Sequence, residues 1–173
     1  NVLVTSLGDR GYIYHVPNFI FNLSRIENGE SWIFPQAITP MIARFLEVMD
    51  QERVSVAKVM GIEVPSFKEY LTRSRGVVGQ NLHESIHRGF DYPVEGPNTP
   101  QHRFVLEDVP YMLVPILSLG KMLGVPMPVS EAVLEIASTL YGMDFWKEGR
   151  TVQKLGLVGL TPEEIRKLMT DGP

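Results

Sequence analysis

Two of the four histidines lie four residues apart, in the string His-Glu-Ser-Ile-His at residues 83–87. On a helix, residues at i and i+4 share a face, so His83 and His87 could hold a zinc ion, with the glutamate as a general base. A catalytic zinc needs a third protein ligand, but His102 follows a proline-rich loop, His15 lies far upstream and no acidic residue has a suitable spacing. The glutamate of the string and the arginine that follows the string also stand at i and i+4, which equally indicates a solvated helix face. We therefore expect no metal site and keep zinc at His83 and His87 as the less favoured alternative.

A second candidate group combines one histidine with a cluster of charged residues. His15 follows a tyrosine and precedes Val-Pro. It is either a hydrogen-bonded, partly buried side chain, which the local composition favours, or a general acid–base group, since histidine titrates near working pH. Downstream, Arg103 stands close to the carboxylates Glu107 and Asp108, which could form a local salt bridge and offset a helix dipole. An arginine beside the apolar Phe104, at the start of a proline-led helix, could also present two parallel hydrogen bonds to a carboxylate.

Composition and charge limit the classes of function. The chain has 173 residues, no cysteine, 16 basic and 20 acidic side chains, and a formal net charge of −4. This length is enough for one domain with a buried core. The lack of cysteine excludes a disulfide scaffold, a thiol nucleophile and a cysteine-bound metal, and the cytoplasm is the expected location. No dense basic run is present, so nucleic acid is not an expected partner. The most apolar segment, residues 109–120, is too short for a membrane span, so no membrane association is expected.

The clearest helix signal begins at Thr39. Thr39 is a good N-cap, Pro40 suits the first helical position, and apolar residues recur at helical spacing up to Gly61, where the helix should end. The polar residues between them, Glu52 among others, should share the opposite face. This pattern predicts an amphipathic helix of about six turns that packs on one side only.

Further helices are expected at residues 66–75, 80–90 and 130–141, from 162 onward, and in a segment that has Glu107, Asp108 and Pro110 in its first turn and runs to Leu123. Pro115 should kink this last helix. Ser130 should cap the next helix, which Gly142 should end, and Thr161 opens a capping box with the glutamate three residues later. Residues 1–37 are irregular and glycine-dotted, and either a strand end or a loop entering a helix fits them. Because no alternating strand follows residue 35, the sequence predicts an all-α fold.

Several motifs, taken in order along the chain, resemble one enzyme family. The downstream set is Arg-Phe-x-x-Glu-Asp-Val-Pro at 103–110, Leu-Val-Pro at 113–115, Leu-Gly-Val-Pro-x-Pro at 123–128, Asp-Phe at 144–145 and Gly-Arg-Thr-x-x-x-Leu-Gly-Leu at 149–157. The upstream set is the His15 segment with Asn22, Ile-Thr-Pro at 38–40 and Asp-x-Glu-Arg at 50–53. Together they resemble the helical C-terminal domain of opine dehydrogenases, the octopine/nopaline dehydrogenase family. The resemblance implies a bundle-like helical substrate domain, of the kind also found in 6-phosphogluconate-dehydrogenase-like enzymes.

The resemblance also implies a reaction and the residues that carry it. Enzymes of this family join the amino group of an amino acid to a 2-oxo acid and reduce the resulting imine with NAD(P)H. The family's catalytic histidine falls on His15, its partner aspartate on Asp108 and its oxo-acid-binding arginine on Arg103. Asp108 would then orient the imidazole and stabilise its charged form, His15 would move protons at the new amine, and Arg103 would fix an anionic substrate.

The family carries an N-terminal dinucleotide-binding domain, whereas no Gly-x-Gly-x-x-Gly motif occurs in this chain. The first residue is an asparagine, and we expect an upstream Rossmann-type domain that binds NAD or NADP, with residues 1–173 forming a single helical substrate domain that is inactive alone. The expected partners are the amino acid, the 2-oxo acid, this Rossmann-type domain and, as an open alternative, a second copy of the chain. Two hypotheses remain: the substrate half of an opine dehydrogenase, or a non-catalytic all-α association or dimerisation module.

Overall fold

The computed structural model describes residues 2–171, which form helices joined by loops, without a β-strand. The α-helices in chain order are α1 (Val2–Gly8), α2 (Gly11–Phe21), α3 (Leu23–Glu27), α4 (Pro40–Val59), α5 (Phe67–Arg75), α6 (Leu82–Gly89), α7 (Arg103–Leu106), α8 (Val114–Met122), α9 (Pro128–Tyr141), α10 (Phe145–Glu148) and α11 (Pro162–Asp171). A 3₁₀ turn, η1, covers Pro35–Ala37, and a π-helical turn, η2, covers Val109–Leu113. The predicted all-α fold is confirmed. No helix within residues 2–171 is long and apolar enough to cross a membrane.

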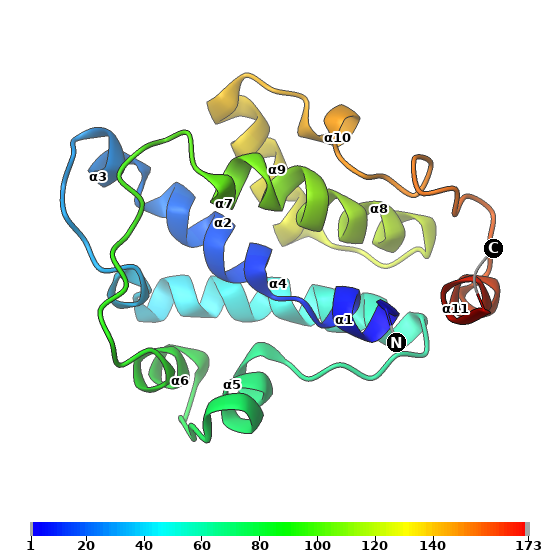
Figure 1. Cartoon of the computed structure of the whole chain (residues 1–173), viewed down its shortest axis with the longest axis horizontal. Helices are drawn as coiled ribbons and strands as arrows, with labels where there is room; N and C mark the ends of the chain where they lie inside the picture. The colour runs from blue at the N-terminus through cyan, green and yellow to red at the C-terminus, as the bar shows by residue number, and fades with distance from the viewer. Residues whose placement is uncertain (1, 172–173) are drawn as a thin grey trace.

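Helix α4 lies at the centre of the arrangement (Figure 1). Helix α2 runs obliquely across it, α8 and α9 lie on one side, and the α5–α6 pair lies on the other. Helix α1 contacts both α4 and α11, so the two ends of the described chain meet. The core is a cluster of buried apolar side chains to which each of these α-helices contributes.

The two ends of α4 follow the local sequence signals. The Thr39 hydroxyl accepts a hydrogen bond from the N–H of Ile42 at 3.4 Å, and Pro40 is the first helical residue. Just beyond the other end, Gly61 has a φ of +67°, a conformation that glycine adopts without the strain of a side chain. The predicted start and end of this helix are confirmed.

The prediction that α4 packs on one side only is wrong, because α4 contacts α2, α6, α8 and α9. Glu52, expected on the polar face, is buried. Its carboxylate accepts hydrogen bonds from the N–H of Val129 at 2.8 Å, the N–H of Ser130 at 2.9 Å and the Ser130 hydroxyl at 2.6 Å. The prediction that Ser130 caps the following helix is also wrong. Helix α9 begins at Pro128, before Ser130, and the Glu52 carboxylate on α4 accepts hydrogen bonds from the first N–H groups of α9.

A buried ion pair on α4 holds two neighbouring segments in place. Arg53 is fully buried, and its Nε and Nη2 donate to Asp50 Oδ1 at 2.9 and 2.7 Å. The guanidinium also donates to the carbonyl oxygens of Leu7 at 2.5 Å and Pro65 at 2.8 Å, while Asp50 Oδ2 accepts the N–H of Phe67 at 2.5 Å. These bonds attach the end of α1 and the start of α5 to α4, and they compensate the desolvation of both charges.

The region that the sequence left open, residues 1–37, is largely helical where the structure describes it. Helix α2 includes Pro17 in its interior, and α3 follows it directly. The buried side chain of Asn18 donates to the carbonyl oxygen of Phe34 at 2.9 Å, which holds the loop after α3 against α2. Asn1 lies outside the described residues.

The helix predicted to run to Leu123 consists of the π-helical turn η2 followed by the α-helix α8, with the change between Leu113 and Val114. Pro115 lies in the first turn of α8, and the kink expected there stays a prediction. Proline is tolerated at that position because its backbone needs no N–H donor there.

The remaining helix predictions are confirmed within a few residues. Helix α6 begins at Leu82, where the Asn81 side chain accepts the N–H of Glu84 at 2.9 Å. Gly142, with a φ of +61°, follows α9. The capping box that opens at Thr161 has both of its reciprocal bonds.

Candidate active site

His15 and Asp108 form a hydrogen-bonded pair across the fold. Nδ1 of His15 on α2 lies 2.8 Å from Oδ2 of Asp108, which immediately precedes η2. The Asp108 side chain is 4% exposed and that of His15 is 29% exposed. A carboxylate can only accept a hydrogen bond, so Nδ1 carries the proton and the neutral ring has its lone pair on Nε2. Nε2 has no hydrogen-bond partner among residues 2–171, so its lone pair is available to accept a proton.

The position of Asp108 depends on how η2 is held. The carbonyl oxygen of Pro110 accepts the N–H of Arg150 at 2.9 Å, which ties this turn to the segment after α10. The approach is close: a Cβ atom at Gly149 would lie 2.6 Å from Cβ of Val114 and 2.8 Å from the Pro110 carbonyl oxygen. Glycine at this position therefore allows the contact that fixes the turn and, with it, the carboxylate.

Aromatic side chains surround the imidazole of His15. The ring of Phe104 stacks on it, with 3.9 Å between centroids and 11° between planes. The Phe34 ring packs edge-to-face with the imidazole, with 6.0 Å between centroids. It also packs against the Phe104 ring, with 5.2 Å between centroids. In the sequence Phe104 is only an apolar neighbour of Arg103, and no local signal predicts its contact with His15.

A second histidine supports the segment that carries these residues. Nδ1 of His102 accepts the N–H of Phe104 at 3.3 Å and so caps α7. Its ring also packs edge-to-face against that of Phe104, with 4.4 Å between centroids. Burial and the nearby charge of Arg103 lower the pKa of His102, which favours the neutral ring that can accept this bond. His102 therefore stabilises the start of α7.

Arg103 lies on the same short helix, with its side chain in solvent. The side chain is 65% exposed, and its Nε lies 3.4 Å from Oε2 of Glu107, which is 58% exposed. The structure thus shows the local salt bridge with Glu107 that the sequence allowed, and no bond to Asp108. A role for Arg103 in substrate binding stays a prediction.

His83 and His87 have their own contacts on α6. Their ring centroids lie 4.3 Å apart, and Nε2 of His87 is 3.0 Å from the carbonyl oxygen of Ile38. Glu84 forms an ion pair with Arg88, as the spacing indicated. No group of three or more potential metal-ligating side chains occurs within residues 2–171. The absence of a zinc site at this pair stays a prediction.

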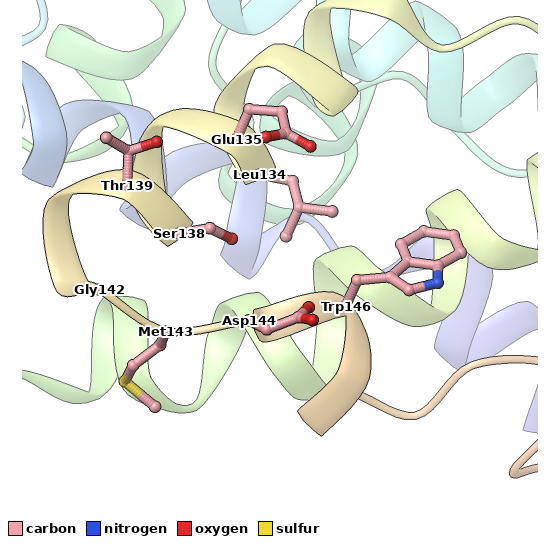
Figure 2. A pocket seen from close by; sticks show the side chains of 8 residues that line it. All are labelled: Leu134, Glu135, Ser138, Thr139, Gly142, Met143, Asp144 and Trp146. Atoms are coloured by element: carbon pink, nitrogen blue, oxygen red, sulfur yellow. The ribbon is translucent and has the colours of Figure 1, made fainter.

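Two pockets occur among the described residues, and neither is lined by His15 or Asp108. Figure 2 shows one of about 420 Å³ between the end of α9 and α10, lined by Leu134, Glu135, Ser138, Thr139, Gly142, Met143, Asp144 and Trp146. The Asp144 carboxylate accepts the N–H of Lys147 at 2.9 Å and caps α10. A second pocket, of about 380 Å³, adjoins α1 and includes Asp9 and Met112 among its lining residues. A Cβ at Gly11 would approach both of these residues and Nδ1 of His15, so Gly11 lies between residues of this pocket and the dyad.

Comparison with known proteins identifies the family. Residues 1–141 match the family described as NAD/NADP octopine/nopaline dehydrogenase, alpha-helical domain. The chain belongs to this family. An opine dehydrogenase of Arthrobacter sp. (strain 1C) is 38% identical over 168 residues, which cover 96% of this chain and 47% of that protein. A vitopine synthase of Allorhizobium ampelinum is 26% identical over 88% of this chain and 43% of that protein.

Solved structures of the family share the fold. An octopine dehydrogenase in complex with NADH and agmatine has a TM-score of 0.74 at 17% identity, over 95% of this chain and 49% of that one. An octopine dehydrogenase described with NADH and L-arginine has a TM-score of 0.68 at 19% identity, over 89% of this chain and 46% of that one. The chain thus spans about half the length of the relatives that it matches. The resemblance noted in the sequence and the helical-domain fold are both confirmed.

Proposed function

We propose that this chain is the substrate-binding and catalytic domain of an NAD(P)-dependent opine dehydrogenase. Such an enzyme condenses an amino acid with a 2-oxo acid and reduces the product to a secondary amine. The observation that carries the proposal is the hydrogen bond between the partly exposed His15 and the buried Asp108, in a member of this family. An association module would not need a buried carboxylate directed at a partly exposed imidazole.

His15 is suited to move protons during the condensation. The amino group must lose a proton before it attacks the carbonyl carbon, and the hydroxyl of the resulting carbinolamine must gain one before it leaves as water. The free Nε2 of His15 can accept the first proton and return it for the second step. Asp108 keeps the proton of the neutral ring on Nδ1 and stabilises the imidazolium while it exists.

Arg103 is proposed to bind the carboxylate of the 2-oxo acid. A guanidinium matches a carboxylate through two parallel hydrogen bonds. Its contact with Glu107 is long and exposed, and a surface pair of this kind contributes about 0 to 1 kcal/mol. The guanidinium can therefore exchange this partner for a substrate carboxylate at little cost.

The dinucleotide is proposed to bind to another domain. Among the described α-helices, α2 begins at a glycine, Gly11, but the Asp9 carboxylate accepts the N–H of Gly11 at 2.7 Å. A negative charge at that helix start would repel a pyrophosphate. We therefore propose an N-terminal Rossmann-type domain that holds NAD or NADP, with residues 1–173 as a single helical domain. A cytoplasmic location and a homodimer rest on the sequence alone and stay predictions.

The test uses the enzyme in which this chain is joined to its dinucleotide-binding domain. Oxidation of NADH or NADPH is followed with an amino acid and a 2-oxo acid, and the secondary amine is identified by mass spectrometry. His15→Asn should lower the rate by about 10²- to 10⁴-fold, the usual contribution of general acid–base catalysis. His83→Asn, a matched change on α6, should leave the rate unchanged. Turnover that survives His15→Asn would overturn the proposed role, and a complete lack of turnover would favour the association module.

The domain assignment has its own test. Residues 1–173 alone should not bind NADH or NADPH in a calorimetric titration, because their sequence contains no Gly-x-Gly-x-x-Gly motif to hold the pyrophosphate at a helix start. Micromolar binding to the isolated chain would contradict the proposed division of labour.

A further inference from the structure

We propose that Phe104 is the positioning residue of the dyad: it fixes the plane of the His15 imidazole so that Nε2, and not Nδ1, is presented to the substrate. The hydrogen bond to Asp108 restrains only one atom of the ring. The ring could still turn about its bond to Cβ and exchange that partner. A flat surface at van der Waals distance supplies the missing restraint. The Phe104 ring stacks on the imidazole with 3.9 Å between centroids and 11° between planes, so the imidazole cannot turn without colliding with it.

Phe104 is itself held firmly enough to act in this way. Its N–H is bonded to Nδ1 of His102, and its ring packs edge-to-face against the ring of the same histidine. On another side it packs against Phe34, whose carbonyl oxygen is bonded to the buried Asn18. The aromatic plane is therefore built into the fold from α2, α7 and the loop after α3.

One short segment supplies both restraints on the imidazole. Phe104 and Asp108 stand four residues apart, and the N–H of Glu107 bonds to the carbonyl oxygen of Arg103 while the N–H of Tyr111 bonds to that of Glu107. The segment is thus continuous in its hydrogen bonding from α7 into η2. Phe104 has no group that can exchange a proton, so it acts through His15 and not on the substrate.

The first experiment reads the ring nitrogens of His15 by ¹H–¹⁵N NMR in the full-length protein that contains this chain, with the signals assigned from His15→Asn. In the unmutated chain at a pH where His15 is neutral, Nδ1 should be protonated and Nε2 unprotonated. Phe104→Leu removes the flat surface, so the two nitrogen shifts should move toward each other as the tautomers mix. The Cε1 proton should also move downfield, because the ring current of Phe104 is lost.

Matched variants separate positioning from general packing. Phe90→Leu makes the same change in a ring that stacks on Tyr14, with 5.1 Å between centroids and 14° between planes. This variant should leave the His15 signals in place. Phe104→Tyr keeps the flat ring and should restore them. Phe104→Met serves where Phe104→Leu does not fold. A folded Phe104→Leu or Phe104→Met chain with an unchanged His15 tautomer would overturn the proposal.

The kinetic consequence rests on the proposed function, and the NMR result does not. In the complete enzyme, Phe104→Leu should lower kcat by about 10- to 100-fold, the cost of a small misplacement of a catalytic group, with little change in KM for the 2-oxo acid. Phe104→Tyr should recover most of kcat. If the kcat of Phe104→Leu is no lower than that of Phe90→Leu, the positioning role is overturned. If the unmutated enzyme shows no turnover, only the proposed function is overturned.

Discussion

Asp108→Asn tests whether His15 and Asp108 act as one catalytic unit. The substitution keeps an oxygen that can accept from Nδ1 but removes the negative charge. The Nδ1–Oδ2 distance is 2.8 Å and the Asp108 side chain is 4% exposed, so solvent screens the pair poorly. A hydrogen bond to a charged group contributes about 1.5 to 3 kcal/mol. If that contribution applies to the imidazolium formed during proton transfer, kcat should fall by about 10- to 150-fold, since 1.4 kcal/mol is a factor of ten.

The double variant decides the question. His15→Asn alone should cost about 10²- to 10⁴-fold in kcat. Without the imidazole Asp108 has nothing to orient, so His15→Asn with Asp108→Asn should be little slower than His15→Asn alone. The assay is the initial rate of NADH oxidation with saturating amino acid and 2-oxo acid in the complete enzyme. Urea unfolding of each variant separates a loss of rate from a loss of fold.

Glu107→Gln is the matched control, because it removes a neighbouring carboxylate that is exposed and does not contact His15. It should leave kcat within about two-fold, as expected for a surface pair. The reasoning is refuted if Asp108→Asn lowers the rate by the same factor with and without His15. Asp108 would then be only an acidic residue at the start of η2.

Three further predictions concern other residues. Arg103→Lys should leave stability unchanged and lower kcat/KM for the 2-oxo acid by about 10- to 100-fold, because lysine cannot form the paired hydrogen bonds to a carboxylate. The loss should be much smaller for the amide analogue of the 2-oxo acid. Equal losses on both substrates would make Arg103 a structural residue. Protein purified without a histidine tag should contain no stoichiometric zinc, since a zinc site needs at least three protein ligands; zinc that disappears in His87→Ala would contradict this. The Tyr14 hydroxyl is buried and has no hydrogen-bond partner within residues 2–171, so Tyr14→Phe should raise the free energy of unfolding by about 1 kcal/mol. Tyr141→Phe should lower the free energy of unfolding by about 1 kcal/mol, because the Tyr141 hydroxyl donates to the carbonyl oxygen of Pro100 at 2.5 Å. If urea unfolding shows that Tyr14→Phe destabilises the protein and Tyr141→Phe stabilises it, the assignment of the unbonded and the bonded hydroxyl is wrong.

The sequence by itself determined where most helices begin and end. Thr39 and Gly61 bracket α4, and Thr161 begins a capping box, because each of these signals acts on partners within one helical turn. The order of the motifs also predicted the family, and the resemblance to that family implied that His15 and Asp108 are a pair. Their hydrogen bond is present in the structure, while their roles in catalysis stay predictions.

Only the tertiary structure decided which distant groups meet. The helical period placed Glu52 on a polar face, but α9 begins beside it and its free N–H groups bind the carboxylate. Likewise, nothing near Phe104 in the sequence indicates that its ring lies on His15, because that contact depends on how α2 crosses the segment leading into η2. Caps and turns are formed by residues close together in the chain and can be predicted from them. Burial and stacking depend on which surfaces the completed packing brings into contact, and no local pattern encodes that.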